Sequence, residues 1–298
     1  MEESTAMHLG PPTDAAALDA LFASIEAADG VPALTEYKIM RYRDHGEVGV
    51  ALTTAADVTI GYVQVAHHPG GGAASPGHWA VEIAVDPSCR SPATYEPLIR
   101  EGAASVPPDE RYVVWAWHDA LQIALEQAGY TETRRLLRLE CALPVEATAP
   151  VTPGVTIRAF EVDQDEAAWL RVNNAAFAGH PENGAVTLAD LEERFRRPWF
   201  DPADLLMAWE GSDLLGSCWT KHHPLGVGEI YILGVSPRAQ GRGLGRELVV
   251  RGLDHLYGTG STTGMLYVDG DNKAAMWLYS DLGFRPMRAN RQYERVEV

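Results

Sequence analysis

The chain has 298 residues and a formal net charge of −17, and 46% of its residues are hydrophobic while 22% are charged. This composition is typical of a water-soluble globular protein, and the length allows two domains that each bury a core. The acidic balance argues against a broad surface for nucleic acid or for an anionic membrane, although locally clustered basic residues can still hold an anionic cofactor.

The beginning of the chain lacks the basic region and apolar run of a signal peptide, and no apolar stretch approaches membrane-spanning length. Cys89, Cys141 and Cys218 are isolated from one another and do not have the spacing of a zinc or redox motif. We therefore expect a cytoplasmic monomer in a reducing compartment, with no bound metal.

The first half of the chain predicts two helices followed by strands. Apolar residues at helical spacing indicate a helix at 17–25, and a second helical run begins near Glu36. Alternation of apolar and polar residues predicts a strand pair near 48–53 and 58–66. We interpret residues 67–72, which hold two histidines and three glycines, as a loop.

The two halves of the chain repeat the same landmarks. Residues 84–87, Ala-Val-Asp-Pro, match 234–237, Gly-Val-Ser-Pro, and residues 128–130 match 282–284 around a central glycine. The spacing of these landmarks is similar in both halves, and the period is too long for a solenoid unit. A stretch rich in Pro, Ala and Thr at 143–154 is the predicted linker. The pattern therefore predicts two copies of one α/β fold.

The two predicted domains, 1–142 and 155–298, are not equivalent. Opposite a glycine-rich turn at 240–245 in the second domain, the first domain has residues 90–95, which contain no glycine. Pro92 in that segment also lacks the N–H that a phosphate would need. We expect the first domain to be non-catalytic, with weak or absent cofactor binding.

The second half predicts an alternation of strands and helices around one central strand. Thr187 is the expected N-cap of one helix, because Asp190 follows it three residues later. The predicted strands lie at 155–158, 205–209, 214–221, 229–235, 264–268 and 291–295, and the predicted helices at 165–177, 187–195, 244–256 and 272–279.

The glycine-rich turn after strand 229–235 predicts an anion site. Glycines allow backbone N–H groups to turn toward a bound anion, and the N-terminus of the following helix adds favourable partial charge. No Gly-Lys-Ser/Thr follows, so the turn differs from a nucleotide P-loop. An ordinary turn that caps a helix is the alternative. Three nearby arginines favour a phosphate ligand: Arg238, Arg242 and Arg246.

This turn resembles the acyl-CoA signature Gln/Arg-x-x-Gly-x-Gly/Ala of the GCN5-related N-acetyltransferases. A later segment is similar to the last motif of that fold through Asn272, Ala275, Tyr279, Gly283 and Phe284. The resemblance covers 155–298 and, with the internal repeat, implies two tandem folds of the α/β (α+β) class. Each is expected to be a mixed, mostly antiparallel central sheet flanked by helices.

A narrower resemblance is to the mycothiol synthase family of tandem acetyltransferases. It implies acetylation, by acetyl-CoA, of the cysteinyl amine of a glucosaminyl-inositol precursor. In the first domain, only Asp29, Gly30, Glu36, Asp86 and Pro87 are similar to this family. In the second domain, the segments that carry the resemblance are 172–173, 177–182, 198–202, 219–221, 228–231 and 266–268.

The expected chemistry is attack of a primary amine on a thioester. The family pattern places the general base at Glu229 on the central strand, and Tyr279 is the candidate acid that protonates the departing CoA thiolate. Glu229 as an ordinary edge carboxylate and Tyr279 as a packing aromatic are the alternatives. A backbone N–H near Leu233, Gly234 and Val235 could stabilise the oxyanion.

The resemblance also implies binding residues. The expected substrate contacts are Glu36, Glu182, Lys221, Glu229 and Tyr267, although for Glu36 and Lys221 an ordinary surface charge is an equal alternative. Glu36 and Glu182 suggest that the acceptor is held between the domains. The expected acetyl-CoA contacts are Leu233, Gly234, Val235, Gln240, Gly241, Arg242, Gly243, Leu244, Gly245, Arg246, Asn272, Lys273, Ala274, Ala275, Met276 and Trp277.

Two other functions compete with this interpretation. The first is an acetyltransferase for another amine, such as a protein N-terminus or an aminoglycoside. The second is an acyl-CoA-binding sensor without turnover, for which neither Glu229 nor Tyr279 would be needed. His180 could act as a base, but its position beside Pro181 in a loop favours a role in shaping the substrate pocket.

Overall fold

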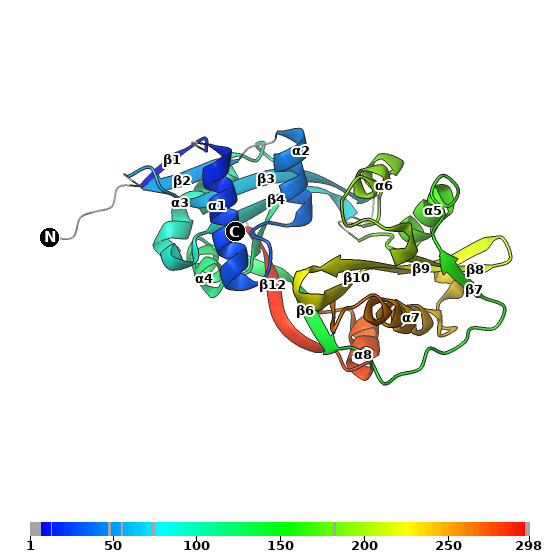
Figure 1. Cartoon of the computed structure of the whole chain (residues 1–298). Coiled ribbons are helices and arrows are strands. Elements are labelled where there is room, and N and C mark those ends of the chain that lie inside the picture. The colour runs from blue at the N-terminus through cyan, green and yellow to red at the C-terminus, as the bar shows by residue number, and fades with distance from the viewer. Residues whose placement is uncertain are drawn as a thin grey trace. The chain divides into compact units, whose positions relative to one another are not determined.

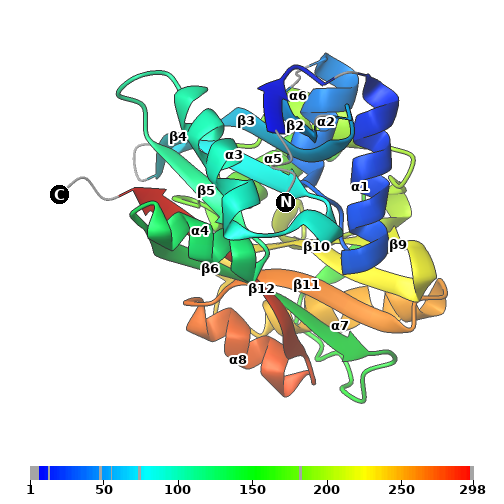
Figure 2. The same cartoon turned by 90° about the vertical axis from the view of Figure 1, so that its left-hand side faces the viewer.

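The computed structural model describes residues 7–12, 14–46, 49–54, 56–72, 75–180 and 183–295. The chain divides into two compact units, which are coloured along the sequence in Figures 1 and 2. Unit 1 comprises Met1–His68, His78–Arg135 and Asn290–Val298, and unit 2 comprises Pro69–Gly77 and Leu136–Ala289. We describe each unit by itself.

Unit 1 is built on a mixed sheet. Its strands follow the order β1-β2-β3-β4-β5-β12-β6. Neighbours β4 and β5 are parallel, whereas β2 and β3 are antiparallel, as are β5 and β12. The strands that contribute to it are β1 (Met7–Gly10), β2 (Val50–Thr54), β3 (Thr59–Gly72), β4 (Ser75–Val85), β5 (Tyr112–Ala116), β6 (Tyr130–Ala142) and β12 (Arg285–Arg295).

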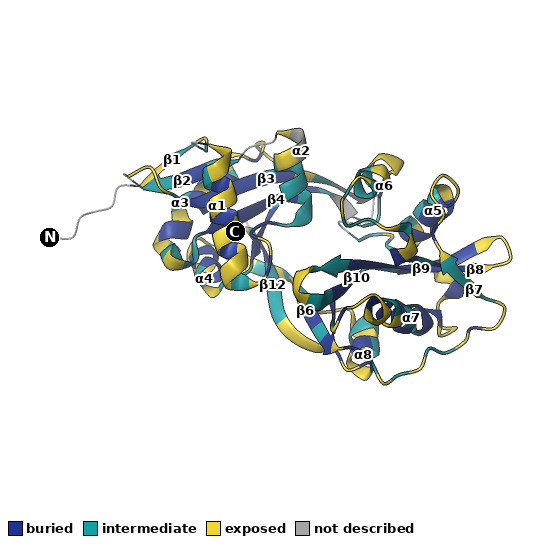
Figure 3. Cartoon of the chain, viewed as in Figure 1, coloured by how far each residue is buried: buried dark blue, intermediate teal, exposed yellow. Residues whose placement is uncertain are grey.

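Helices cover both faces of this sheet. Side chains on a strand alternate between its faces, so neighbouring residues pack against different helices. Tyr62 and Ala84 belong to the core cluster formed with helix α1 (Ala15–Asp29). Their sequence neighbours Val63 and Val85 belong instead to the cluster with two further helices. The remaining helices of unit 1 are α2 (Glu36–His45), α3 (Pro92–Ala104) and α4 (Asp119–Gln127). In Figure 3, much of β3 and β4 has the colour of buried residues, whereas α1 carries exposed residues along its length.

Unit 2 repeats this plan. Its strands follow the order β6-β11-β10-β9-β8-β7, and only β10 and β11 are parallel among the pairs with a described register. Cys218 packs in the cluster with α7 and α8, whereas its neighbour Trp219 packs in the cluster with α5 and α6. The elements are β7 (Thr156–Ala159), α5 (Glu166–Ala176), α6 (Leu188–Phe195), β8 (Leu205–Glu210), β9 (Asp213–His223), β10 (Val227–Val235), α7 (Leu244–Gly258), β11 (Thr263–Asp269) and α8 (Lys273–Asp281).

The internal repeat is visible as the same element order in each half. After β4 come a 3-10 turn (Pro87–Cys89), α3, β5, α4 and β6, and after β10 come a 3-10 turn (Pro237–Ala239), α7, β11, α8 and β12. Gly129 and Gly283 end the corresponding helices with left-handed φ values of 84° and 90°. Such a φ is reached by glycine at little cost, which explains why both halves have a glycine there.

The last strand of each repeat completes the sheet of the other repeat's unit. In unit 2, residues 136–142 of β6 pair with β11, for example Leu139 with Leu266. In unit 1, the end of β12 pairs with β5, for example Tyr293 with Val114. The sequence-based division at 143–154 into a non-catalytic and a catalytic domain stays a prediction.

Most of the predicted elements coincide with the structure, with one clear difference. Residues 67–72 were expected to form a loop, but their backbone continues strand β3. Thr187 caps α6 as predicted, because its hydroxyl accepts from the N–H of Asp190 while the Asp190 carboxylate accepts from the N–H of Thr187. None of the helices in the described ranges has the length and apolar character needed to cross a lipid bilayer.

Candidate active site

The candidate site lies in unit 2, where β10 and β11 diverge. Their parallel pairing covers 227–229 and 263–265, and in the described chain no register continues beyond Glu229 and Met265. On its other edge β10 stays paired with β9, up to Val235 opposite Gly216. Beyond Glu229, the edge of β10 that β11 has left therefore offers backbone N–H and C=O groups to a ligand that can bind like an additional strand.

A bulge in β10 decides which side chains face which helices. The register with β9 shifts between Ile230 and Ile232, so Tyr231 is an extra residue. Ile230 consequently packs with the α7 and α8 cluster, whereas Ile232, two residues later, packs with the α5 and α6 cluster. In a regular strand, these two side chains would share a face.

Glu229 is a buried carboxylate next to this bulge. Its side chain is 9% exposed, and its Oε2 lies 2.7 Å from Nε2 of His223. In the described chain, this is the one hydrogen bond of the Glu229 side chain. A short hydrogen bond to a ring nitrogen fixes the orientation of a carboxylate while the second oxygen is left to meet a proton donor.

Lys221 lies directly across the ladder from Glu229 and is also buried. Its ammonium nitrogen is 4.2 Å from the ring centroid of Trp199 and 5.0 Å from that of Tyr231. Cation–π contacts of this kind hold an ammonium in place without neutralising its charge. Arg194 donates to the Tyr231 hydroxyl at 3.3 Å and orients that ring.

Tyr267 lies on the same face of the sheet as Glu229. Met265 is the parallel partner of Glu229, and Tyr267 follows it by two residues on β11. Burial, reinforced by the negative charge of Glu229, raises the pKa of Tyr267 to about 12. Its phenol is therefore protonated at neutral pH and can donate a hydrogen bond.

Tyr279 lies on the opposite face, in the core cluster that contains Ile230. It is 6% exposed, and its ring makes an edge contact with Phe284 at 5.7 Å. Burial raises the pKa of Tyr279 above its ordinary value, and nearby Cys218 adds to this shift. Because neighbouring residues Glu229 and Ile230 point to opposite faces, the two candidate catalytic side chains flank the sheet from both sides.

The glycine-rich turn has the backbone that an anion site requires. Gly241 and Gly243 have φ values of 76° and 83°, and Gly243 is the N-cap of α7. A Cβ at either position would meet nothing within 4 Å, so these glycines are required for conformation and not for space. Leu244 is buried and anchors the helix, whereas Gln240, Gly241 and Arg242 are exposed. The turn thus presents the N-terminal N–H groups of α7 to solvent.

Alanine substitutions in this turn test the prediction that it binds acetyl-CoA. An alanine at Gly241 or Gly243 adopts a left-handed φ at a cost of about 1–2 kcal/mol, so the free turn is expected to relax to another conformation. Restoring the binding conformation would then cost the same free energy, which corresponds to roughly a 10-fold increase in the KM for acetyl-CoA. Gly260→Ala is the matched control, because Gly260 also has a left-handed φ, of 106°, and a Cβ there would meet nothing within 4 Å, but it follows the C-terminus of α7 and lies outside the predicted contacts. Steady-state titration of acetyl-CoA measures the effect, and equal KM values in all three variants would contradict it.

The three arginines near the turn each contact an acidic side chain. Arg238 lies 3.2 Å from Asp213 and Arg242 lies 2.6 Å from Glu210. Arg246 lies 2.5 Å from Asp281. The side chains of these pairs are about one-third to two-thirds exposed, and exposed ion pairs contribute little to stability. A phosphate group can therefore compete for the same guanidinium groups.

The segment around the N-terminus of α8 combines capping and packing. Asn272 caps this helix, since its Oδ1 accepts from the N–H of Ala275 at 3.1 Å. Ala275 and Met276 pack partly against the α7 and α8 core. Lys273, Ala274 and Trp277 are exposed, and Trp277 is 69% exposed. The exposed members of this set are free to flank a ligand at the neighbouring turn.

Two further residues were predicted to contact the substrate, Glu36 and Glu182. Glu36 belongs to unit 1, where it is half-buried in the first turn of α2. Glu182 lies outside the described residues. His180 is described: its Nε2 is 3.6 Å from Asp269 and its ring makes an edge contact with Phe177.

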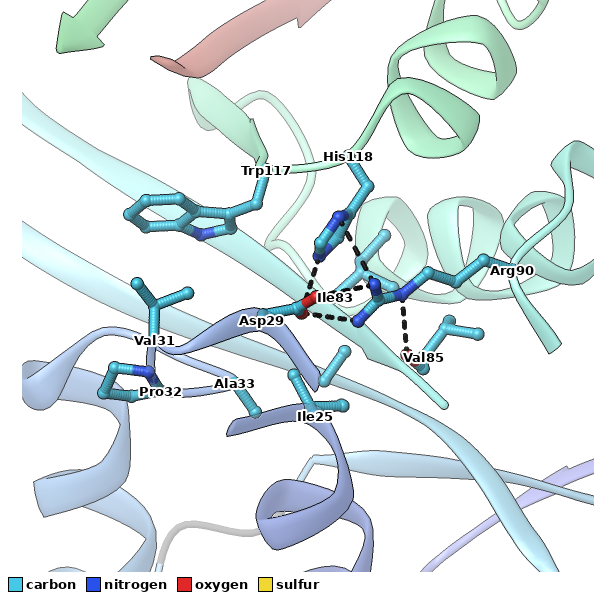
Figure 4. A pocket seen from close by; sticks show the side chains of 11 residues that line it. Ile25, Asp29, Val31, Pro32, Ala33, Ile83, Val85, Arg90, Trp117 and His118 are labelled. Carbon is cyan, nitrogen blue, oxygen red and sulfur yellow. Dashed lines mark hydrogen bonds and ion pairs between the residues drawn. The ribbon is translucent and has the colours of Figure 1, made fainter. Parts of the chain in front are cut away.

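Unit 1 has a small pocket lined in part by residues 83–85, the segment that the repeat aligns with residues 233–235 of β10 (Figure 4). Arg90 donates two hydrogen bonds to the Asp29 carboxylate, at 2.9 and 2.6 Å, and one to the carbonyl of Val85 at 3.2 Å. His118 Nε2 lies 3.1 Å from the same carboxylate. The polar side chains in this pocket bind one another, and the weak or absent cofactor binding expected of the first domain stays a prediction.

His223 is a residue that the sequence patterns did not single out. It follows Lys221 by two residues and reaches Glu229 across a short 3-10 turn (Pro224–Gly226). A hairpin register drawn through this turn would have placed Val227 opposite His223, and thus the imidazole close to Glu229. The strand predicted from the sequence covers 214–221 and ends before His223, so the sequence pattern does not indicate this pairing.

The comparisons with known proteins agree with this geometry. The chain is 39% identical over 289 residues to the mycothiol acetyltransferase of Streptomyces avermitilis, which covers 95% of this chain and 92% of that protein. It is 41% identical over 270 residues to the mycothiol acetyltransferase of Thermomonospora curvata, with 89% and 88% covered. The chain belongs to the mycothiol acetyltransferase family.

The family model of the acetyltransferase (GNAT) family matches residues 168–284, which include Glu229, the glycine-rich turn and Tyr279. A GCN5-related N-acetyltransferase from Sphaerobacter thermophilus superposes with a TM-score of 0.73 at 22% identity, over 100% of this chain and 98% of that one. A tandem GNAT protein from the clavulanic acid biosynthesis pathway superposes with a TM-score of 0.71 at 12% identity, over 98% and 100%. The predicted fold of two tandem N-acetyltransferase domains is confirmed, and this family member is an acetyltransferase.

Proposed function

We propose that this member of the mycothiol acetyltransferase family acetylates the cysteinyl amine of 1-D-myo-inositol 2-(L-cysteinylamino)-2-deoxy-glucopyranoside, with acetyl-CoA as co-substrate, to give mycothiol. The observation that carries the proposal is the buried carboxylate of Glu229, hydrogen-bonded to His223 at the point where β10 and β11 diverge. A general base in that position meets an amine beside the edge that would hold the acyl donor.

The reaction requires proton removal from the amine and proton donation to the departing thiolate. An α-amino group has a pKa of about 7.7–8.0, so a large share of it arrives protonated, and Glu229 accepts a proton from it directly or through water. The amine nitrogen then bonds to the thioester carbonyl carbon, and the carbonyl oxygen becomes an oxyanion. The attacking nitrogen, which now carries a positive charge, loses a second proton through water. When this intermediate collapses, the C–S bond breaks, the thiolate takes the proton of Tyr279, and solvent returns a proton to the phenolate.

Acetyl-CoA would bind along β10 and the turn that follows. Leu233, Gly234 and Val235 would pair with the pantetheine amides as an added strand, and one N–H of this edge would stabilise the oxyanion. The N-terminus of α7 with the turn 240–246 would hold the pyrophosphate. This arrangement would place the thioester at the divergence of the strands, between the faces that carry Glu229 and Tyr279.

The acceptor would contact the face of unit 2 that carries Glu229. Lys221 would donate to a sugar or inositol hydroxyl, and Tyr267 would donate from a phenol that burial keeps protonated. Glu36 and Glu182 would accept from the ammonium or from sugar hydroxyls. We further propose that turnover belongs to residues 155–298 alone and that the protein acts as a monomer in the cytoplasm, where its three free thiols stay reduced.

The deciding experiment is a steady-state acetylation assay with a panel of amines. The panel holds the cysteinyl glucosaminyl-inositol, free cysteine, a peptide with a free N-terminus and an aminoglycoside. We expect kcat/KM to be highest for the cysteinyl glucosaminyl-inositol. An equal or higher value for another amine would overturn the proposed acceptor, and binding of acetyl-CoA without turnover on any amine would instead indicate a sensor.

His223 should act as a positioning residue for Glu229. His223→Leu removes the hydrogen bond at 2.7 Å, so we expect kcat to fall about 10-fold with an unchanged KM for acetyl-CoA, because the base loses its orientation. His223→Gln keeps an amide donor and should recover most of the activity. Recovery of kcat in the glutamine variant, with equal melting temperatures in both variants, distinguishes this role from a structural one. An equal kcat in both variants and the unaltered protein would contradict the role.

A further inference from the structure

Unit 2 holds a second cluster of ionisable side chains, separate from the candidate active site. Asp204 ends a 3-10 turn (Pro202–Asp204), His222 is on β9 and His255 is in the last turn of α7. One ligand atom from each of the three side chains lies within 4.8 Å of the other two. His222 and Lys221 are neighbours on a strand, so His222 points to the face opposite the substrate residues.

One distance between ligand atoms in this cluster is shorter than the spacing around a bound zinc ion, and another is longer. Asp204 Oδ1 lies 2.6 Å from His255 Nε2 and 3.8 Å from His222 Nε2. Ligand atoms around a tetrahedral zinc ion, bound at about 2.0–2.2 Å, are roughly 3.3 Å apart. The three ligand atoms lie within 4.8 Å of one another, so side-chain shifts of up to about 1.5 Å would bring both nitrogens and the carboxylate oxygen to zinc distance.

Two hydroxyl groups hold the imidazole of His222 in place. Its Nδ1 lies 3.2 Å from the hydroxyl of Ser261, and its Nε2 lies 3.1 Å from the hydroxyl of Thr259. When Nδ1–H donates to Ser261, Nε2 carries the lone pair that a metal needs, and metal-ligating histidines are generally held by such a second partner. The Thr259 hydroxyl donates to the His255 carbonyl, so without an ion it accepts from Nε2–H of His222, and an ion bound at Nε2 would replace that proton and leave Nδ1–H to donate to Ser261.

The carboxylate of Asp204 is buried, and a bound cation would balance its negative charge. Its side chain is 8% exposed, and a buried carboxylate is costly unless it is paired. The imidazoles of His222 and His255 are 36% and 24% exposed, so an ion and one water molecule can reach them from solvent. Two imidazoles and one carboxylate with an open position form a donor set that zinc accepts.

We propose that Asp204, His222 and His255 bind one zinc-class divalent cation. The ion would join three segments that are distant in sequence and fix the end of β9, the strand that carries Lys221 and His223. The site would be structural, and the acetylation chemistry described above does not involve it.

Zinc titration of the chelator-treated, full-length protein tests this proposal. Isothermal titration with zinc chloride near neutral pH should show one ion per chain bound at micromolar concentration or tighter, and cobalt should give the visible absorption of a tetrahedral site. Zinc should raise the melting temperature by about 5 °C at 100 times the dissociation constant. A chelator should reverse the rise.

Variants locate the ion. His222→Gln and His255→Gln should each weaken zinc binding by about 100-fold, and Ser261→Ala by about 10-fold, the range typical of groups that orient a ligand. His8→Gln, an exposed histidine of unit 1, is the matched control and should leave binding unchanged. If His255→Gln fails to fold, zinc binding by the His222→Gln variant decides the question, because the His222 side chain is 36% exposed and its substitution should be tolerated.

Two results would overturn the site. The first is the absence of zinc binding by the unaltered protein, and the second is equal binding in the folded His222→Gln variant. Either would show that Asp204 and His255 form a hydrogen-bonded ion pair without a metal.

Discussion

Glu229→Gln is expected to lower kcat for acetylation of the cysteinyl amine by about 10²–10⁴-fold, the range that a positioned general base supplies. Glutamine has nearly the same volume and can still bond to His223, so the 2.7 Å contact and the packing of β10 are retained. What is lost is the carboxylate that accepts the ammonium proton. The KM for acetyl-CoA should change little, because the cofactor edge and the turn 240–246 are untouched.

Glu247→Gln is the matched control for this variant. Glu247 is also a buried glutamate of unit 2, and it accepts from the N–H of Thr152 and pairs with Arg251. Its substitution should lower the free energy of unfolding while the activity of the folded protein stays near its original value. If Glu229→Gln retained more than about one-tenth of the original kcat, the assignment of Glu229 as general base would be wrong.

Tyr279→Phe is expected to lower kcat by about 10²-fold or more, because the departing thiolate loses its proton donor. Burial raises the pKa of Tyr279 above its ordinary value of 10, so the phenol keeps its proton across the whole assay range below that pH. Any alkaline loss of activity below pH 10 should therefore belong to another group, and its position should be the same in the unaltered protein and in the variant.

The matched control for Tyr279→Phe is Tyr293→Phe. Tyr293 is buried in unit 1, where its hydroxyl donates to Glu126 at 3.1 Å, and the proposed chemistry does not use it. Its loss should affect the melting temperature and leave kcat unchanged. An equal kcat for Tyr279→Phe and the unaltered protein would reduce Tyr279 to a packing residue, which was the alternative interpretation from the sequence.

Local features of this protein were predictable because neighbouring residues determine them. The cap of α6 follows from Thr187 and Asp190, and the turn before α7 follows from glycines that can adopt φ values of 76° and 83°. The repeat was recognisable because Pro87 and Pro237 end corresponding strands. The glycine-rich turn and the segments around Glu229 were sufficient to identify the acetyltransferase fold and the family.

Other features depend on contacts between segments that are distant in sequence. The exchange of β6 and β12 between the two units could not be predicted, because both strands have similar patterns and the choice of partner is made by the whole sheet. The bulge that turns Ile230 and Ile232 to opposite faces could not be predicted, because an apolar stretch has no alternation of polar and apolar residues that a bulge would interrupt.

The sequence by itself determined the elements, the tandem repeat, the acetyltransferase family and the candidate catalytic pair, because these depend on short patterns and on residue identity. Only the tertiary structure placed His223 against Glu229, enclosed Lys221 between Trp199 and Tyr231, and gathered Asp204, His222 and His255. The physical reason is the same in each case: strand register and helix packing bring these side chains together, and neither is encoded by the spacing of the residues along the chain.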